Sequence, residues 1–536
     1  MSKRPVALGL DFGTESVRAL LVDAAGAELA SASAAYADGQ ITRSLPGSEE
    51  PLPADYALQN PDDWTASAAA AVRGAVAKAG VDAGRVVGVG VDFTSCTMLP
   101  CEADGTPLCR TDRFRGTPLS WPKLWKHHGA KSQTARMQRV AEERDEPFLR
   151  RYGGLIGLEW LPPKMLETIE EAPEVADACG CWVEAGDWYV WQLVGGDAPP
   201  RSTCQAGYKA LWSAADGYPP GDYFEAVHPK LAEAVRDRLP GRFLSPGEAA
   251  GGLTAAAAES LGLREGTPVS AAVIDAHAAV PGVGAAGPGT LVMVLGTSSC
   301  HMLNAESGPF VPGVAGVVEG GILPGLFGYE TGQAAVGDAF DWLRRLVGED
   351  DFARLGPAAA ALPPGAGGVR CLDWLNGCRT PLMDASVRGA FTGLSLATRP
   401  EHLYRALLEA SGCGVRWIVE TLREHGVPVD RLVATGGLPH HNRDLVRVYA
   451  DLIGEPVEVH PSTQGPALGA AILGMVAAGE AGGFGTLTEA VETMAGVPEG
   501  DRDLVTPDPV KKPAYDAVYA DYRALADYEG GRVRRL

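Results

Sequence analysis

The chain has 536 residues, more than one hydrophobic core usually organises, so we expect two large domains. Hydrophobic residues make up 46% of the sequence and charged residues 21%, which is typical of soluble globular proteins and excludes wholesale disorder. The formal net charge of −21 repels phosphate backbones and anionic lipid heads, and the sequence has no compensating basic patch. We therefore expect neither a nucleic-acid partner nor a membrane partner.

The apolar stretches do not predict export or membrane insertion. The longest uncharged stretch, residues 276–305, is interrupted by prolines and glycines and so does not predict a spanning helix. Lys3 and Arg4 are followed by an apolar run that Asp11 cuts short, so no secretory segment forms. The ten Cys lack the paired spacing of a zinc or redox site, which predicts buried free thiols. These features predict a cytoplasmic protein.

The first hundred residues predict a three-stranded meander, a helix and a buried strand. The helix begins after Asn60 with Pro61 in its first turn, and Gly80 ends it. The fourth strand pattern is almost continuously apolar, as in a central parallel strand. The strand patterns cover residues 6–11, 17–23, 28–35 and 86–92.

A similar order recurs in the second half, beginning with an apolar run at residues 289–295. The later patterns predict a helix at 401–425, a strand at 431–435, a helix from about Asn442, a strand at 456–460 and a small-residue helix at 464–479. Strands that alternate with helices in both halves indicate two α/β domains. Because residues 283–288 lack periodicity, we expect domains at 1–285 and 286–504, with a helical C-terminal extension at 505–536.

Three glycine-rich turns follow strand patterns and are candidates for binding phosphate. They are Gly13-Thr14 after Asp11, Gly296-Thr297-Ser298, and Gly436-Gly437. Each turn alone is equally typical of an ordinary hairpin or strand-to-helix connection. Three of them in two similar domains fit a phosphate chain gripped from both sides by amides and hydroxyls. The sequence contains neither a P-loop nor a Rossmann fingerprint in a suitable context.

Asp275 follows the apolar pair Val273 and Ile274 and precedes a helix-compatible segment. The residues alone allow two interpretations, a helix-capping carboxylate or a carboxylate exposed at a strand end, where it could accept a proton.

The chain resembles the FGGY family of carbohydrate kinases from residue 6 to residue 522. The segment Gly389-Ala-Phe-Thr-Gly393-Leu394 resembles the C-terminal signature of that family. The resemblance to members that act on L-ribulose is carried by further segments, at residues 57–61, 91–100, 124–128, 159–164, 184–188, 201–209, 273–277, 329–333 and 373–381. It implies an α/β fold with two actin-like (ribonuclease H-like) ATPase domains and a cleft between them.

This resemblance also implies the function. We expect an ATP- and Mg²⁺-dependent kinase that phosphorylates the C5 hydroxyl of L-ribulose in L-arabinose catabolism. The N-terminal domain would bind mainly the sugar, and the C-terminal domain mainly ATP. A kinase for another ketopentose or pentitol, such as D-ribulose or ribitol, stays open, as does a homodimer. A nucleotide switch related to actin or the 70-kDa chaperones is the alternative from another class.

The resemblance assigns roles to individual residues. Asp275 is implied as the catalytic base and Asp11 as a ligand of Mg²⁺ through water. The implied sugar contacts are Cys96, Lys209, Asp275 and Glu330. The implied ATP contacts are Gly13, Thr14, Gly296, Thr297 and Ser298 at the phosphates and Gly436, Gly437 and Asn442 around adenosine. His441 departs from the family pattern, which has Lys at this position.

Overall fold

The structure is a computed structural model that describes residues 4–533. The chain forms two compact units, which are described separately. The first contains the residues up to Ala286 together with Val318–Gly328 and Gln464–Gly496. The second contains Gly287–Val317, Tyr329–Thr463 and the chain from Val497 onward.

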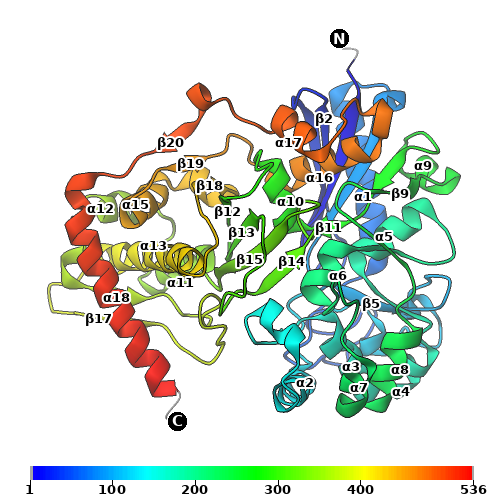
Figure 1. Cartoon of the computed structure of the whole chain (residues 1–536), viewed down its shortest axis with the longest axis horizontal. Coiled ribbons are helices and arrows are strands. Elements are labelled where there is room, and N and C mark those ends of the chain that lie inside the picture. Colours follow the sequence, from blue (N-terminus) through cyan, green and yellow to red (C-terminus); the bar gives the residue numbers. More distant parts are fainter. Residues whose placement is uncertain (1–3, 534–536) are drawn as a thin grey trace. The chain divides into compact units, whose positions relative to one another are not determined.

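The first unit is built on a sheet with the strand order β3-β2-β1-β4-β10-β9, and β11 also pairs with β4 (Figure 1). β1–β3 form the expected antiparallel meander, and β4 joins β1 in parallel. The strands are β1 (Val6–Phe12), β2 (Ser16–Asp23), β3 (Glu28–Ala35), β4 (Val86–Phe93), β9 (Ala249–Gly252), β10 (Pro268–Ser270) and β11 (Val273–Ile274).

α1 (Pro61–Ala79) makes the crossover from β3 to β4 that a parallel pair requires. The Asn60 side chain accepts a hydrogen bond from the Asp62 amide at 2.9 Å, and Gly80 ends the helix at φ 58°. The predicted helix limits are therefore confirmed by their capping residues. Trp64 of α1 is fully buried in a core with Leu8 and Leu10 of β1.

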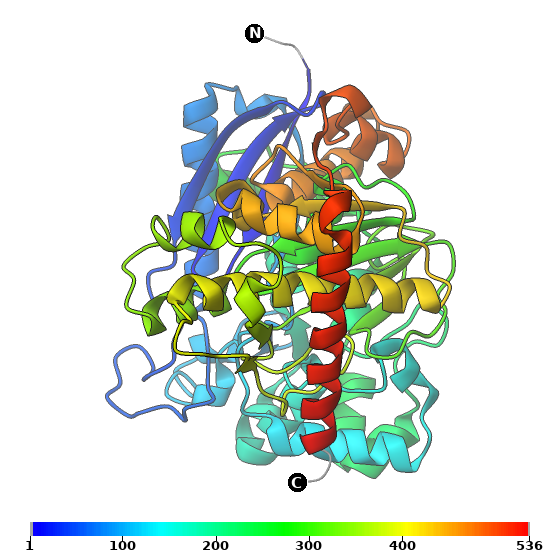
Figure 2. The ribbon, with the colours of Figure 1, turned by 90° about the vertical axis from the view of Figure 1, so that its left-hand side faces the viewer.

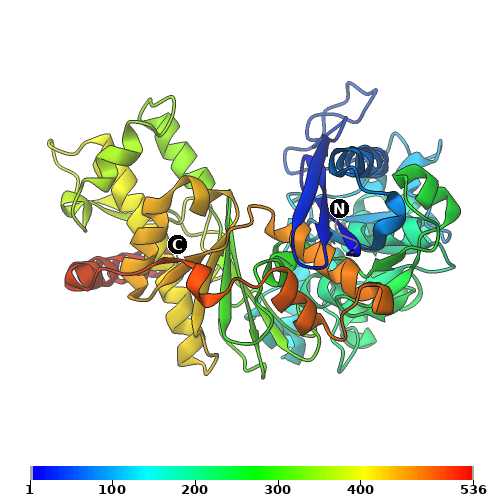
Figure 3. The ribbon, with the colours of Figure 1, turned by 90° about the horizontal axis from the view of Figure 1, so that it is seen from above.

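α16 (Gly465–Ala477) covers the other face of the same sheet, beside the blue strands in Figure 3. Its backbone lies directly on the strands: a Cβ atom at Gly9 would be 1.9 Å from the Ala467 carbonyl oxygen. A Cβ at Gly90 would be 1.7 Å from the Ala470 oxygen. This contact requires glycine, and it places residues 464–496 in the first unit although the sequence assigned them to the second domain.

The rest of the first unit is largely helical and has its own apolar core. Its two-stranded sheets are β5 (Met98–Cys101) with β6 (Cys181–Glu184) and β7 (Pro200–Ser202) with β8 (Arg242–Leu244). Its helices are α2 (Lys131–Glu143), α3 (Leu161–Glu171), α4 (Pro173–Ala178), α5 (Ala185–Val194), α6 (Thr203–Lys209), α7 (Gly221–Val227), α8 (Pro229–Asp237) and α9 (Ala255–Leu261). Two further helices, α10 (Asp275–Gly282) and α17 (Leu487–Met494), pack against α16.

The second unit repeats the topology of the first. Its strand order is β14-β15-β13-β12-β18-β19-β20, in which β12 pairs antiparallel with β13 and parallel with β18. The strands are β12 (Thr290–Leu295), β13 (Ser299–Ala305), β14 (Gly316–Glu319), β15 (Phe327–Gln333), β18 (Arg431–Thr435), β19 (Val457–Val459) and β20 (Asp503–Val505). The last two residues of β14 and the first two of β15 belong to the segment Val318–Gly328 of the first unit. The repeated order β15-β13-β12-β18 matches β3-β2-β1-β4, so both predicted α/β halves are confirmed.

Helices and a small β16–β17 sheet complete the second unit. They are α11 (Gly337–Leu346), α12 (Leu355–Ala360), α13 (Pro400–Glu424), α14 (Gly437–His441), α15 (Arg443–Ile453), β16 (Arg370–Leu372) and β17 (Ala390–Thr392). The C-terminal helix α18 (Lys512–Val533) crosses α13 in Figure 2. Tyr515 accepts a hydrogen bond from Arg405 at 2.6 Å, and Tyr522 donates one to Asp373 at 2.9 Å, so α18 is part of its own unit.

Two expectations about the whole chain can be compared with the structure. All ten Cys are free thiols, and all but Cys300 are buried. Across residues 4–533, every helix is too short or too polar to traverse a lipid bilayer.

Candidate functional site

Three carboxylates lie at the carboxyl edge of the first sheet. Asp11 of β1 and Asp92 of β4 occupy opposite positions in the parallel register. Val273 of β11 is the other neighbour of Asp92, and Asp275 follows two residues later as the first residue of α10. Asp275 accepts a hydrogen bond from the Ala276 amide at 2.7 Å and is partly exposed. The edge therefore gathers carboxylates where ligands of open α/β sheets usually bind.

Burial and mutual repulsion separate the protonation states of these groups. Burial raises the pKa of Asp92 well above its usual value, and the charges of Asp11 and Asp275 raise it further. Burial also raises the pKa of Asp11, but the Arg18 guanidinium, 3.3 Å away, opposes this shift. Burial therefore raises the pKa of both carboxyls, and Asp92, which has two carboxylate neighbours, is shifted further than Asp11.

The ligand atoms available at this sheet edge determine which metal ion the edge can bind. Within residues 4–533, no three His, Cys, Asp or Glu side chains are grouped as ligands of one ion. The oxygens of Asp11 and Asp92 are hard donors, and no donor group of the described residues satisfies either oxygen of Asp92. Mg²⁺ prefers oxygen ligands and keeps several of its waters, so these residues fit an ion held mainly through water.

The first predicted phosphate turn is closed by its own backbone. The Gly13 amide donates to the Ser16 carbonyl oxygen at 3.0 Å. The side chains around it fix Thr14: its hydroxyl accepts from Trp125 Nε1 at 3.1 Å and its carbonyl from Gln59 Nε2 at 2.8 Å. The Gly13 amide is thus used inside the turn, while the Thr14 hydroxyl keeps its proton to donate.

The second turn, in the second unit, has the same internal bond. The Gly296 amide donates to the Ser298 carbonyl oxygen at 3.0 Å. Behind it, the Gly337 amide donates to Gly296 at 3.0 Å and the Asp338 amide to Thr297 at 3.1 Å, which fastens the turn to α11. Gly296 and Thr297 remain exposed. The backbone is anchored from behind and its outer face is accessible.

The third turn, between β18 and α14, contains two glycines with different roles. A Cβ at Gly436, whose φ is 93°, would lie 2.6 Å from the Leu295 carbonyl oxygen, so this glycine is required by the fold. A Cβ at Gly437 would meet nothing within 4 Å. The bare backbone at Gly437 therefore borders open space, as a close approach by a ligand requires.

Asn442 has a structural role at the start of the helix that the sequence predicted from about this position. It is the N-cap of α15, where its Oδ1 accepts from the Leu445 amide at 3.1 Å. Its Nδ2 donates to the Tyr404 hydroxyl at 3.1 Å. The side chain is thus committed to the start of α15, and His441 beside it is exposed.

Cys96 stands in a left-handed backbone conformation, with φ 57°, and is 1% exposed. Burial raises the pKa of its thiol to about 12, so it is no nucleophile. The fully buried Lys164 ammonium holds the turn by donating to the Cys96 carbonyl at 2.7 Å and the Leu124 carbonyl at 2.8 Å. Lys164 was not among the predicted site residues. The signal that could have identified it is its position among the apolar residues at the start of α3.

Lys209 and Glu330 belong to different units. Lys209 ends α6, and its ammonium lies 5.9 Å from the ring centroids of both Trp160 and Tyr208. Glu330 lies in β15, 6% exposed, and its carbonyl oxygen accepts from the Ala315 amide at 2.8 Å. The structure brings Asp11 and Asp275 to one sheet edge of the first unit, which also contains Cys96 and Lys209.

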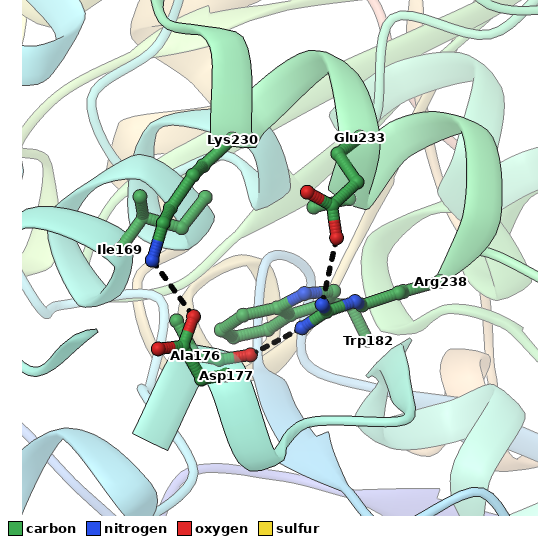
Figure 4. Close-up of a pocket in the computed structure, with 8 residues that line it drawn as sticks. Ile169, Ala176, Asp177, Trp182, Lys230, Glu233 and Arg238 are labelled. Carbon is green, nitrogen blue, oxygen red and sulfur yellow. Dashed lines mark hydrogen bonds and ion pairs between the residues drawn. The ribbon is translucent and has the colours of Figure 1, made fainter. Parts of the chain in front are cut away.

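Two hollows lie away from these residues. The first has a volume of about 20 Å³ and lies between α4, α8 and Trp182 (Figure 4). Its charges pair with one another, Lys230 with Asp177 at 2.8 Å and Arg238 with Glu233 at 2.9 Å. It has room for about one water molecule.

The second hollow, of about 260 Å³, lies between α12, α13 and α15. Its cations also have carboxylate partners, in the pairs Arg405–Glu409, Arg447–Asp444 and Lys511–Asp451. Neither hollow includes a predicted site residue.

Two sheets of one topology, with carboxylates at the edge of one and Gly/hydroxyl turns in both, define a two-domain protein of the actin-like ATPase fold. Solved structures support this class. A xylulose kinase from Rhodospirillum rubrum is 27% identical, with a TM-score of 0.77 over 97% of this chain and 98% of that one. A Plasmodium falciparum glycerol kinase with ADP, 15% identical, has the same fold, with a TM-score of 0.76 over 97% of both chains.

The chain belongs to the FGGY family of carbohydrate kinases. The N-terminal domain of that family matches residues 6–282 and its C-terminal domain residues 291–478. Among the relatives, a ribulokinase from Bacillus licheniformis is 44% identical over 529 residues, which cover 96% of this chain and 95% of the relative. One from Mycolicibacterium smegmatis is also 44% identical, over 99% of this chain and 95% of the relative.

Proposed function

We propose that this protein is an ATP-dependent kinase that phosphorylates the C5 hydroxyl of L-ribulose, giving L-ribulose 5-phosphate for L-arabinose catabolism in the cytoplasm. The observation that supports the substrate is the 42–44% identity to several ribulokinases over nearly the whole chain. The FGGY domains support the reaction class.

Asp275 acts as the base in this proposal. Its carboxylate takes the proton of the C5 hydroxyl while the oxygen forms a bond to the γ-phosphorus of ATP. The bond to the β–γ bridging oxygen breaks, and its electron pair leaves with ADP. Asp275 suits this role because it is partly exposed and already oriented by the Ala276 amide. The first turn of α10 fixes the carboxylate, so it need not be ordered during the reaction.

The remaining assignments follow the charges of the site. Asp11, which lies 3.3 Å from the Arg18 guanidinium, would hold Mg²⁺ through water, and the ion would neutralise charge on the ATP phosphates when bound. The Thr14 hydroxyl and the exposed turn at Gly296 and Thr297 bind those phosphates, with Gly13 and Ser298 shaping the two turns. The backbone at Gly436 and Gly437 borders adenosine, with Asn442 holding the start of α15.

Lys209, Cys96 and Glu330 contact the sugar. The Lys209 ammonium, 5.9 Å from the ring centroids of both Trp160 and Tyr208, would donate hydrogen bonds to sugar hydroxyl groups. The turn at Cys96 presents backbone that the Lys164 ammonium holds rigid. A cation and a carboxylate together fix a polyol by charge-assisted hydrogen bonds.

The test is ADP release with Mg-ATP across a panel of L-ribulose, D-ribulose, D-xylulose, ribitol, glycerol and no acceptor. The proposal predicts that L-ribulose gives the largest kcat/KM. If D-ribulose or ribitol leads, the kinase reaction stands and the substrate is wrong. Hydrolysis that is indifferent to every polyol would instead identify a nucleotide switch.

A further inference from the structure

Two buried polar side chains of the first unit have no hydrogen-bond partner. Glu184, the last residue of β6, is 2% exposed, and Gln205, in the first turns of α6, is 1% exposed. Across residues 4–533, no group hydrogen-bonds to either oxygen of Glu184 or to the amide oxygen or nitrogen of Gln205. Buried polar groups are normally paired, so two such side chains need an explanation.

The two residues belong to neighbouring elements. Gly186, two residues after Glu184, sits against the Gln205 amide: a Cβ at Gly186 would be 2.3 Å from Gln205 Nε2. The same region is tied together by Asp187, which accepts the Ser202 amide at 3.0 Å at the start of α6. The first turns of α5 and α6 therefore meet where the unpaired groups are.

This place adjoins the residues assigned to the sugar. Glu184 is opposite Met98 in the β5–β6 pair, and Met98 is two residues after Cys96. Lys209 is four residues after Gln205 on α6, so both side chains are on one face of that helix. The positive charges of Lys164 and Lys209 both act on the Glu184 carboxylate. Glu184 and Gln205 thus belong to elements that lie next to Cys96 or include Lys209.

Buried carboxylates elsewhere in this unit show what a structural role looks like. Asp187, 1% exposed, accepts the backbone amide of Ser202. Glu167, fully buried, hydrogen-bonds to His127 at 2.9 Å. Glu184 differs from both because no group among residues 4–533 hydrogen-bonds to its carboxylate. A carboxylate and an amide together offer two acceptors and a donor–acceptor pair, the set that neighbouring hydroxyls of a polyol satisfy.

We propose that Glu184 and Gln205 bind hydroxyl groups of the acceptor sugar and thereby select among polyols. This inference rests on the proposed function, since it takes the same acceptor site as its starting point. Binding satisfies groups that the empty protein leaves unpaired, and a polyol that lacks the matching hydroxyls leaves them so.

The experiment compares Glu184→Gln and Gln205→Met with wild type and with Asp187→Ala, which removes the acceptor of the Ser202 amide, as the structural control. Both substitutions keep the side-chain size. We expect the KM for L-ribulose to rise about 10-fold or more in each, with the KM for ATP within about twofold. We also expect the rise in Tm that L-ribulose causes in the wild type to be lost, while the Tm without sugar does not fall.

Asp187→Ala, which removes the acceptor of the Ser202 amide, should lower the Tm without sugar and leave the KM values unchanged. If Glu184→Gln and Gln205→Met behave like this control, with normal sugar KM and a lowered Tm, the inference is overturned. A normal sugar KM with an unchanged Tm overturns it as well, because the groups are then satisfied by water alone.

The wild type separates this inference from the proposed function. If a polyol other than L-ribulose gives the largest wild-type response, the proposed substrate is wrong and the variants are compared with that polyol. If no polyol raises the Tm or the turnover of the wild type, both proposals are overturned.

Discussion

The Glu184→Gln substitution should change the pH dependence of stability in the absence of sugar. Burial raises the pKa of Glu184 from 4.5 to about 8, and the nearby Lys164 charge only partly offsets this. The folded protein therefore keeps this proton to a higher pH than the unfolded chain. The stability that the neutral carboxyl contributes is complete below pH 4.5 and is lost as the pH rises through 8.

The size of this loss in the free energy of unfolding follows from the pKa difference between the unfolded and the folded protein. Each unit of pKa difference corresponds to about 1.4 kcal/mol, so about 3.5 units set an upper bound of about 5 kcal/mol. The glutamine variant has no ionisable group and escapes this loss. Its free energy of unfolding should match that of the wild type at pH 5 and exceed it by several kcal/mol at pH 8.5.

Scanning calorimetry at pH 5, 6, 7, 8 and 8.5 measures this difference. Glu225→Gln, on the exposed side of α7, is the control and should show no trend with pH. A Glu184→Gln difference that stays constant with pH, or that favours the wild type at high pH, would refute the reasoning that Glu184 is buried without a donor.

Three further substitutions test other parts of the account. Asp275→Asn should lower kcat by about 10²- to 10⁴-fold while ATP and sugar still bind, as measured by calorimetric titration; near-normal turnover would remove Asp275 as the base. Lys209→Ala should raise the sugar KM by about 10-fold or more and leave the ATP KM almost unchanged, and an equal rise in both would place Lys209 outside the sugar site. Gly90→Ala should destabilise the first unit by about 3 kcal/mol or more in urea unfolding, because its Cβ would meet the Ala470 carbonyl at 1.7 Å. Gly116→Ala, where a Cβ meets nothing within 4 Å, is its control, and equal losses for the two would contradict the packing argument.

The elements that the sequence predicted well are those with local signals. The meander at β1–β3 has apolar runs separated by turn residues, and α1 has a cap at each end, Asn60 and Gly80. How these elements pack against one another is not encoded in their local sequence. α16 was predicted as a helix of small residues, but its return to the first unit depends on glycines in β1 and β4 that are hundreds of residues away.

In the candidate site, too, some features have local sequence signals and others depend on the folded structure. Asp11 and Asp275 could be placed at strand ends because apolar runs precede them. The register sets Asp11 opposite Asp92, and Asp275 follows two residues after Val273, the other neighbour of Asp92. Asn442, which the family resemblance sets beside adenosine, caps α15, and the predicted helix start at about Asn442 agrees with this capping role. The unpaired state of Glu184 and Gln205 is a property of the folded surroundings, and no motif predicts it.

The most direct test of the central claim identifies the product. The protein is incubated with Mg-ATP and L-ribulose, ADP is quantified, and the sugar phosphate is examined by ³¹P and ¹³C NMR. The account predicts one sugar phosphate for each ADP, with phosphorus coupled to C5 of L-ribulose. ADP without sugar phosphate, or phosphate on another carbon, would contradict it.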